Sequence, residues 1–191
     1  MSHNGQCASL DVMFKETKEI LEVLSGDYIA GLVDGEGCFA LNFRQDKKYK
    51  LKGQPEYFYW KVQFAIALRA DDKPLLEKIR DTLDCGSIYL SPPRRRQPSP
   101  ELRYSVQGLK DLKEKIVPFF LNNPLHSKKH EDFVLWAEAV DILHSNKGTP
   151  VKKGELEFQR LLEIAKEMKS YKSKGAAWKW EQTALEGYYA S

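Results

Sequence analysis

Asp34 and Glu36 are two carboxylates separated by a single glycine at the end of an apolar stretch. Carboxylate oxygens are hard ligands of the kind that Mg²⁺ prefers, and a bound divalent cation can activate water for hydrolysis. Glu36 is the candidate for this chemistry, because it stands at the tip with a glycine on either side. A helix end with a solvated glutamate explains the same spacing equally well, so spacing alone leaves both interpretations open.

The stretch before these carboxylates has the features of a helix. Ser25 can cap its N-terminus, and Asp27 falls in the first turn, where the helix dipole favours an anion. The residues that follow are apolar but include the small neighbours Ala30 and Gly31. The two glycines that flank Glu36 are expected to end the helix by taking positive φ and to turn the chain into a strand.

Alternation of apolar and polar residues predicts four strands, at 38–44, 58–69, 87–91 and 101–107. Helical patterns fill the intervals, at 10–24, 72–84, 108–121, 128–142 and 155–172, with Pro118 expected to kink or end the fourth helix of the chain. The element order is αββαββα with extra terminal helices, and the predicted fold class is α+β. We expect a single domain over residues 1–191, with a core at about 24–145 and a C-terminal helical extension at 151–191.

A four-stranded antiparallel sheet covered by helices on one face leaves its other face open. The predicted outward residues of this open face are Asn42, Arg44, Lys61, Gln63, Arg69, Ser87, Tyr89, Arg103, Ser105 and Gln107. Arginine suits the edge of guanine, and asparagine or glutamine suits adenine, in the major groove of DNA. The lysines of the 45–56 loop, together with Arg94, Arg95 and Arg96, suit phosphates. For any single residue, an ordinary solvated sheet surface is the competing interpretation.

The charge distribution supports a polyanionic partner. The formal net charge is only +3, but residues 40–110 hold 15 Lys and Arg against 8 Asp and Glu, a local excess of +7. An asymmetry of this size indicates that one face of the protein meets a polyanion.

Residues Ile29 to Gly37, with the sequence IAGLVDGEG, resemble the LAGLIDADG motif of the homing endonucleases with conservative changes only. The element order agrees with the core of that family over roughly residues 24–145. The chain has one copy of the motif. Single-motif members resemble half of a two-motif enzyme and act as homodimers, and the resemblance implies that the open sheet forms a saddle on DNA.

The resemblance also implies roles for the motif residues. Glu36 matches the second acidic position and is the expected ligand of Mg²⁺ or another divalent cation, and Gly35 would add a backbone carbonyl. Asp34 matches the first acidic position, for which a mainly structural role is expected. Ala30 and Gly31 would allow the motif helices of two copies to approach closely across a twofold axis.

The family places a basic residue near the cleaved phosphate. Lys128 and Lys129, at the start of a predicted helix, resemble that position, with a slight preference for Lys128. Gln63 and Arg69 are weaker candidates for ordering water at the site.

The predicted function is therefore a site-specific, double-strand DNA endonuclease of the intron-homing type, with a long pseudo-palindromic target. The open alternative is an RNA-splicing maturase, with host intron RNA as partner, or a non-cleaving DNA-binding protein of the same fold. The presence of Glu36 favours cleavage. A dinucleotide site on Gly35-Glu36-Gly37 is excluded, because no third glycine follows and a strand comes next.

The composition sets limits on other classes. No apolar run approaches the ~20 residues that span a bilayer, and the N-terminus lacks a basic region followed by an apolar one, so neither a membrane nor a secretory role is expected. The three cysteines form no CxxC pair, which argues against a zinc knuckle or a redox pair. The expected location is intracellular with DNA, in a prokaryotic cytoplasm or an organelle.

Overall fold

The computed structural model describes residues 24–45, 58–91, 100–146 and 155–170. Its strands are β1 (Gly37–Gln45), β2 (Phe58–Arg69), β3 (Ser87–Leu90) and β4 (Glu101–Val106). Its helices are α2 (Gly26–Glu36), α3 (Lys73–Leu83), α4 (Leu109–Asp111), α5 (Val117–Asn122), α6 (Lys129–Ser145) and α7 (Leu156–Ser170), with a 3₁₀ turn at Ala70–Asp72 and a π-helical segment at Leu112–Ile116.

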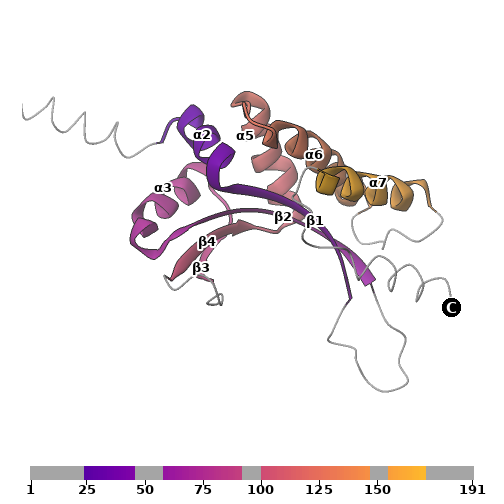
Figure 1. The fold of residues 1–191 in the computed structure, drawn as a ribbon, viewed down its shortest axis with the longest axis horizontal. Coiled ribbons are helices and arrows are strands. Elements are labelled where there is room, and N and C mark those ends of the chain that lie inside the picture. The colour runs from indigo at the N-terminus through magenta and orange to yellow at the C-terminus, as the bar shows by residue number, and fades with distance from the viewer. Residues whose placement is uncertain (1–23, 46–57, 92–99, 147–154, 171–191) are drawn as a thin grey trace, which may run out of the picture.

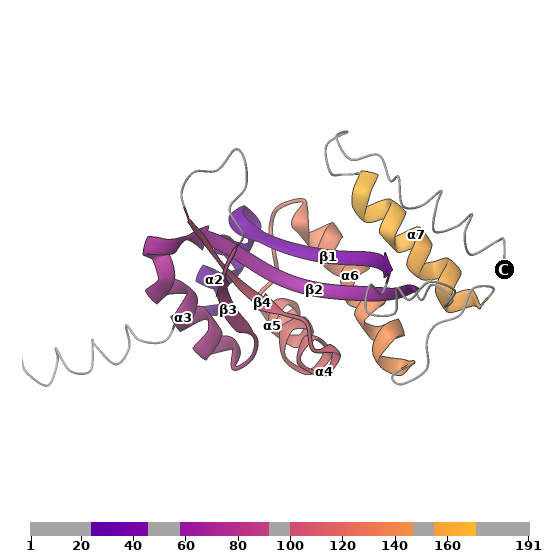
Figure 2. The same cartoon turned by 90° about the horizontal axis from the view of Figure 1, so that it is seen from below.

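The four strands form one antiparallel sheet in the order β1-β2-β4-β3. All the helices lie on one side of it, and its other side is open between the described segments (Figure 1). Seen from below, the long strands β1 and β2 run past α6 to α7, while β4 and β3 lie beside α3 (Figure 2). The predicted α+β class, strand order along the chain and one-sided helical layer are confirmed.

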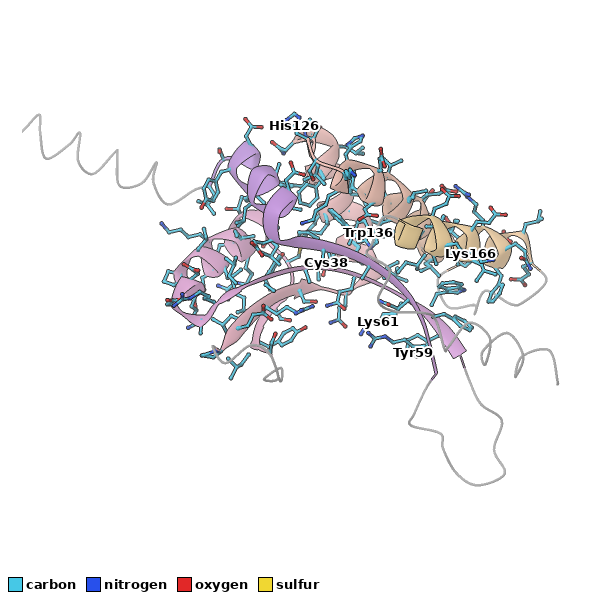
Figure 3. All side chains as sticks on the ribbon, in the orientation of Figure 1. Cys38, Tyr59, Lys61, His126, Trp136 and Lys166 are labelled. Atoms are coloured by element: carbon cyan, nitrogen blue, oxygen red, sulfur yellow. The ribbon has the colours of Figure 1, made fainter. Side chains whose placement is uncertain are left out.

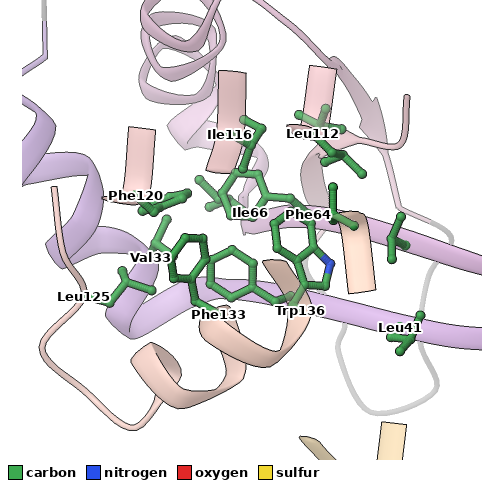
Figure 4. Close-up of a cluster of buried hydrophobic side chains, with 14 of the residues drawn as sticks. Val33, Leu41, Phe64, Ile66, Leu112, Ile116, Phe120, Leu125, Phe133 and Trp136 are labelled. Atoms are coloured by element: carbon green, nitrogen blue, oxygen red, sulfur yellow. The ribbon is translucent and has the colours of Figure 1, made fainter. Parts of the chain in front are cut away.

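The alternation in the sequence assigns the two faces of the sheet correctly. Phe39 of β1 pairs with Phe64 of β2, and both are buried at 2% exposure or less. With Phe120, Phe133 and Trp136 they form an aromatic cluster between sheet and helices, with ring centroids 5.0 to 5.7 Å apart for most pairs (Figure 4). This core fixes the end of α2 and the start of β1, where the candidate chemistry lies.

The helix containing Pro118 does not end there, so of the two expected outcomes, a kink or an end, the end is excluded. Proline lacks an amide hydrogen and cannot make the normal helical bond to the preceding turn. A π-helical segment at Leu112–Ile116 precedes it, and the wider turn absorbs the irregularity, so the helix continues through Asn122.

The described part of the C-terminal extension is α7, which packs at the far end of the sheet. Its Phe158 contacts the rings of Phe43 and Trp60, at centroid distances of 5.7 and 5.8 Å. Arg160 bonds Glu138 of α6 through Nε and Nη2, at 2.6 and 2.8 Å. The expected helix at 10–24 and residues 171–191 lie outside the described residues. No described helix has the length and apolar character to cross a bilayer.

Candidate active site and nucleic-acid interface

Helix α2 has one face in the core and one face exposed. Ser25 caps it by accepting a hydrogen bond from the Tyr28 amide at 3.2 Å. Ile29, Ala30 and Val33 are buried within the protomer at 3% exposure or less. Ala30 therefore faces the core, and of the predicted pair Ala30 and Gly31 only Gly31 lies on the exposed face of the helix. The outer stripe follows the helical spacing i, i+3, i+4, i+7 and consists of Tyr28, Gly31, the half-buried Leu32 and Gly35.

The junction between α2 and β1 depends on close packing and not on positive φ. Gly37 has φ −75° and ψ 158°, and the positive-φ residues of the described chain are Asp84 and Gly86. A Cβ at Gly37 would lie 2.4 Å from Val33 Cγ1 and 2.7 Å from Val33 O, closer than any side chain tolerates. Glycine is therefore required because strand and helix approach closely. Glu36 is the last residue of α2 and is exposed directly beside the first residue of the sheet.

Asp34 anchors the start of α6 to the end of α2. Its carboxylate accepts hydrogen bonds from the amides of His126 at 2.9 Å and Ser127 at 3.2 Å, and from the Ser127 hydroxyl at 2.7 Å. Burial raises the pKa of Asp34, but these three bonds outweigh burial and hold the pKa below its ordinary value. The geometry agrees with the structural role expected for this position.

Lys129 lies at the end of α2, whereas Lys128 does not. The Lys129 ammonium donates to Val33 O at 3.0 Å and to Gly35 O at 2.8 Å, so it neutralises the negative end of the helix dipole. Burial lowers its pKa, and the nearby Cys38, Glu36 and Asp34 act in the opposite direction. Lys128 is exposed. This geometry favours Lys129 over the slightly preferred Lys128, and the role of either lysine near the cleaved phosphate stays a prediction.

The Lys129 contact also tests whether a cation fits at this end of the helix. The Gly35 carbonyl already points to a positive charge, and the Glu36 carboxylate beside it is exposed. Among the described residues, no group of three or more His, Cys, Asp or Glu could hold a metal ion. One chain thus offers a carboxylate and a carbonyl to a divalent cation, which is an incomplete set of ligands.

The open face of the sheet carries the predicted polar residues in cross-strand rows. The register pairs Asn42 with Lys61 and Arg44 with Tyr59 between β1 and β2, and Tyr89 with Arg103 between β3 and β4. Lys61 and Tyr59 point away from the helical layer, on the side opposite Lys166 of α7 (Figure 3). Ser87, Tyr89 and Gln107 are exposed, and Asn42, Lys61, Gln63 and Arg103 are half-buried. Ser105 differs from the prediction, because its side chain is almost fully buried at 3% exposure.

Two cations on this face lie close to one another. Burial lowers the pKa of Lys61, and the neighbouring positive charge of Arg44 lowers it further. Neither side chain forms an ion pair with another residue in the described part of the chain. Like charges held together are stabilised by an external anion, as a phosphate backbone would be.

Other predicted contacts stand differently. The Arg69 guanidinium forms a bidentate pair with Asp71, at 3.1 and 2.8 Å, but remains exposed at the edge of the sheet. Arg94, Arg95, Arg96 and the lysines of the predicted 45–56 loop lie outside the described residues. Their assignment as phosphate contacts stays a prediction.

Sequence reasoning missed Cys38 as a residue of this site. Cys38 is exposed and pairs with Ala65 across β1 and β2, which places it in the open-face row nearest Glu36. Its position could have been found by extending the alternation of β1 one step beyond Ala40. Sequence reasoning also missed that Asp34 binds the α5–α6 connection, because no local pattern links residues 92 positions apart.

The sequence profile described as LAGLIDADG endonuclease matches residues 29–140. "Probable intron-encoded DNA endonuclease 1" of Mycosarcoma maydis is 30% identical over 112 residues, which cover 59% of this chain and 35% of that protein. "Probable intron-encoded endonuclease 3" of Neurospora crassa is 32% identical over 119 residues, which cover 61% of this chain and 20% of that protein. The chain thus spans about a third or less of the curated relatives that it matches.

Solved structures share the fold. The homing endonuclease I-TnaI superposes with a TM-score of 0.67 at 24% identity, and the match covers 87% of this chain and 99% of that one. The I-LtrWI LAGLIDADG homing endonuclease bound to target DNA superposes with a TM-score of 0.60 at 24% identity, covering 75% of this chain and 44% of that one. The chain therefore corresponds to nearly all of one solved chain and to less than half of the other.

Proposed function

The chain belongs to the LAGLIDADG endonuclease family, and on that premise we propose that it is a site-specific DNA endonuclease of the intron-homing type. It hydrolyses both strands of a long pseudo-palindromic duplex with a divalent metal at the axis of a homodimer. The observation that carries this proposal is the exposed Glu36, which lies beside the Lys129 ammonium at the point where α2 meets an open, cation-bearing sheet.

The chemistry at this point is divided between two side chains and one carbonyl. A Mg²⁺ ion held by Glu36 and the Gly35 carbonyl would supply a polarised water and stabilise the charge of the phosphate. Lys129, whose ammonium bonds the Gly35 carbonyl, adds a fixed positive charge that would stabilise negative charge developing on the phosphate. Asp34 holds the start of α6, and therefore Lys129, in place.

A homodimer completes the incomplete ligand set of one chain. The exposed stripe of α2 has no side chain at Gly31 and Gly35, and a Cβ at either would meet nothing within 4 Å in the protomer. Two such helices could therefore approach closely about a twofold axis, which would bring two copies of Glu36 together. The match to nearly all of the I-TnaI chain supports a fold unit that carries one motif, and pairing with a second copy is the proposal that follows from the incomplete ligand set.

DNA is the partner that fits the open face. The open face presents amides and hydroxyls, which suit base edges. It also presents Arg44, Lys61 and Arg103, which suit phosphates. The structural neighbours include homing endonucleases that were solved bound to DNA. We place the protein with DNA inside the cell.

The direct test is incubation of the purified chain with a duplex that spans the uninterrupted insertion locus of its own gene, in Mg²⁺. A discrete double-strand cut is the expected result. Tight binding without any cut would reject cleavage and favour the non-cleaving DNA-binding alternative. Promotion of intron splicing without a cut would favour the maturase.

The Glu36→Gln variant assigns the cut to the proposed site. The amide keeps the size and one oxygen of the side chain but loses the charge that holds Mg²⁺, so cleavage should be abolished. Because Glu36 is exposed and the sheet is untouched, melting temperature and DNA affinity in Ca²⁺ should stay close to those of the wild type. Cutting by Glu36→Gln at the wild-type rate would reject the metal-ligand role and favour the alternative, in which Glu36 is a solvated residue at a helix end.

A further inference from the structure

Three polar side chains on the open face form one hydrogen-bonded unit. Gln63 of β2 donates from Nε2 to the Ser105 hydroxyl oxygen at 2.8 Å, and Gln107 donates from Nε2 to the same oxygen at 3.3 Å. Ser105 is 3% exposed, whereas Gln63 is half-buried and Gln107 is exposed. A buried hydroxyl therefore connects two amides that reach toward solvent.

The strand register explains how the unit is built. Ser105 pairs with Ala65 of β2 and with Ser87 of β3, so its neighbours in the row are small. Its own neighbours along β4, Tyr104 and Val106, face the core. Ser105 therefore belongs to the open face. Its row neighbours have short side chains, and the longer side chains of Gln63 and Gln107 cover it by bonding to its hydroxyl.

We propose that Ser105 is a positioning residue for DNA sequence recognition, which fixes Gln63 and Gln107 as a preorganised pair for reading adjacent bases. This inference rests on the proposed DNA-binding function and adds a residue that does not itself reach the DNA. A free glutamine samples many rotamers, and fixing its amide before DNA arrives lowers the entropy lost on binding.

The bonding pattern selects the base that the pair fits. Each amide uses one N–H on Ser105 and keeps its second N–H and its carbonyl oxygen. A donor and an acceptor side by side match N7 and N6 of adenine in the major groove. The pair is therefore suited to A·T base pairs.

The register also places Gln63 and Gln107 along the half-site, which is the half of the DNA target that one protomer of the dimer would contact. Gln63 pairs with Ala40, whereas Lys61 and Tyr59 pair with Asn42 and Arg44 farther from Glu36. A strand rises about 3.3 Å per residue, close to the roughly 3.4 Å between base pairs, so each second residue advances about two base pairs. Gln63 and Gln107 thus read inner positions, nearer the cut, and Arg44 lies over outer positions.

The test compares the binding preferences of four proteins on a pool of duplexes that are randomised over the half-site, in Ca²⁺. The proteins are the wild type, Ser105→Ala, Ser105→Thr and Arg44→Ala, and bound duplexes are identified by sequencing. Ser105→Ala should lose roughly 10-fold of its base preference at one or two inner positions and keep its outer preferences. Ser105→Thr retains the hydroxyl and should restore the inner preference, and Arg44→Ala should leave it intact.

The Gln63→Ala variant supplies the coupling control. In the Gln63→Ala background, Ser105→Ala can act only through Gln107. Its effect on the base preference at the inner positions should therefore be smaller there than in the wild type. Adding Ser105→Ala to Arg44→Ala should have its full effect. Equal effects in both backgrounds would overturn the inference.

The outcomes separate this inference from the proposed function. A wild-type protein without sequence preference would reject the proposed function itself. A wild-type preference that Ser105→Ala leaves unchanged, or weakens equally at every position together with a lower melting temperature, would reject the positioning role alone.

Discussion

Lys129 connects two parts of the candidate active site that lie more than 90 residues apart in the sequence. Its ammonium bonds the carbonyls of Val33 and Gly35, and Asp34 bonds the segment just before it. The two contacts run in opposite directions between the same two elements. At the scale of single residues, the position of the Lys129 ammonium is thus fixed by its own bonds to α2 and by the bond from Asp34 to the preceding segment.

Replacement of Lys129 with Met should lower the cleavage rate by about 100-fold, because it removes a fixed charge from the site and keeps the aliphatic stem. Lys128→Met is the matched control, since Lys128 is the exposed neighbour and its removal should leave the rate nearly unchanged. Single-turnover cleavage of a saturated duplex measures both. A larger loss in Lys128→Met than in Lys129→Met would restore the sequence-based preference.

Asp34 gives a pH dependence to stability. Its folded-state pKa lies below the ordinary value, so its contribution is fully present above the unfolded pKa of about 4 and is lost as the pH falls through the folded pKa. Asp34→Asn should cost about 1 kcal/mol at pH 7, a figure reduced by solvent screening, and progressively less below pH 4.

Denaturant unfolding at about pH 7 and about pH 3.5, on either side of the ordinary carboxyl pKa, measures how much Asp34→Asn lowers the free energy of unfolding at each pH. Asp27→Asn, which removes an exposed carboxylate from the first turn of the same helix, is the control. A cost of Asp34→Asn that is the same at both pH values would contradict the assigned hydrogen bonds.

At the scale of elements, α2 carries two functions on two faces. Its inner face, with Ile29 and Val33, belongs to the core, and its outer face presents Gly31 and Gly35 to open space. The close junction at Gly37 keeps the end of this helix against the start of β1. Folding and pairing with a second copy can therefore be separated by mutation.

Gly31→Leu should prevent dimer formation and leave the protomer folded. A side chain at position 31 meets nothing in the protomer, and leucine favours the helix over glycine by somewhat less than about 1 kcal/mol. Sedimentation should show a dimer for the wild type and a monomer for Gly31→Leu, and double-strand cutting should disappear in the variant. Lys73→Leu, on the exposed start of α3, controls for added apolar surface. A monomeric wild type that cuts both strands would refute the dimer.

At the scale of the whole molecule, charge and shape agree. The excess of +7 is counted over residues 40–110 of the sequence, and of the described cations in this stretch Lys61 points away from the helical layer on the open face (Figure 3). The mutual repulsion of Arg44 and Lys61 on that face is relieved by a polyanion. This asymmetry explains how a protein of small net charge can present a basic surface.

DNA affinity should therefore fall steeply with salt. Replacing Arg44 and Lys61 together with Gln should flatten the slope of log affinity against log salt by about 2, one unit for each phosphate that is no longer neutralised. Lys166→Gln, on α7 and away from the open face, should leave the slope unchanged. An unchanged slope with an altered base preference in the double variant would show that these side chains read bases.

The strand faces were predictable from sequence because alternation is a local property that the pleated backbone imposes wherever one face is buried. The inward positions of Phe64 and Tyr104 followed from that pattern. Ser105 was placed on the correct face, but its burial was not predictable, since burial depends on the length of the side chains that neighbouring strands bring to the same row.

The sequence by itself determined the motif, the order of helices and strands, and the candidate carboxylate Glu36, all of which depend on residues close together in the chain. Tertiary structure decided that Lys129 and not Lys128 meets the end of α2, that Ala30 faces inward, and that Gly37 is needed for close packing. Each of these depends on how two elements pack. A helix fixes the direction of its side chains, but the atoms that a side chain contacts are set only when the second helix or strand packs against it.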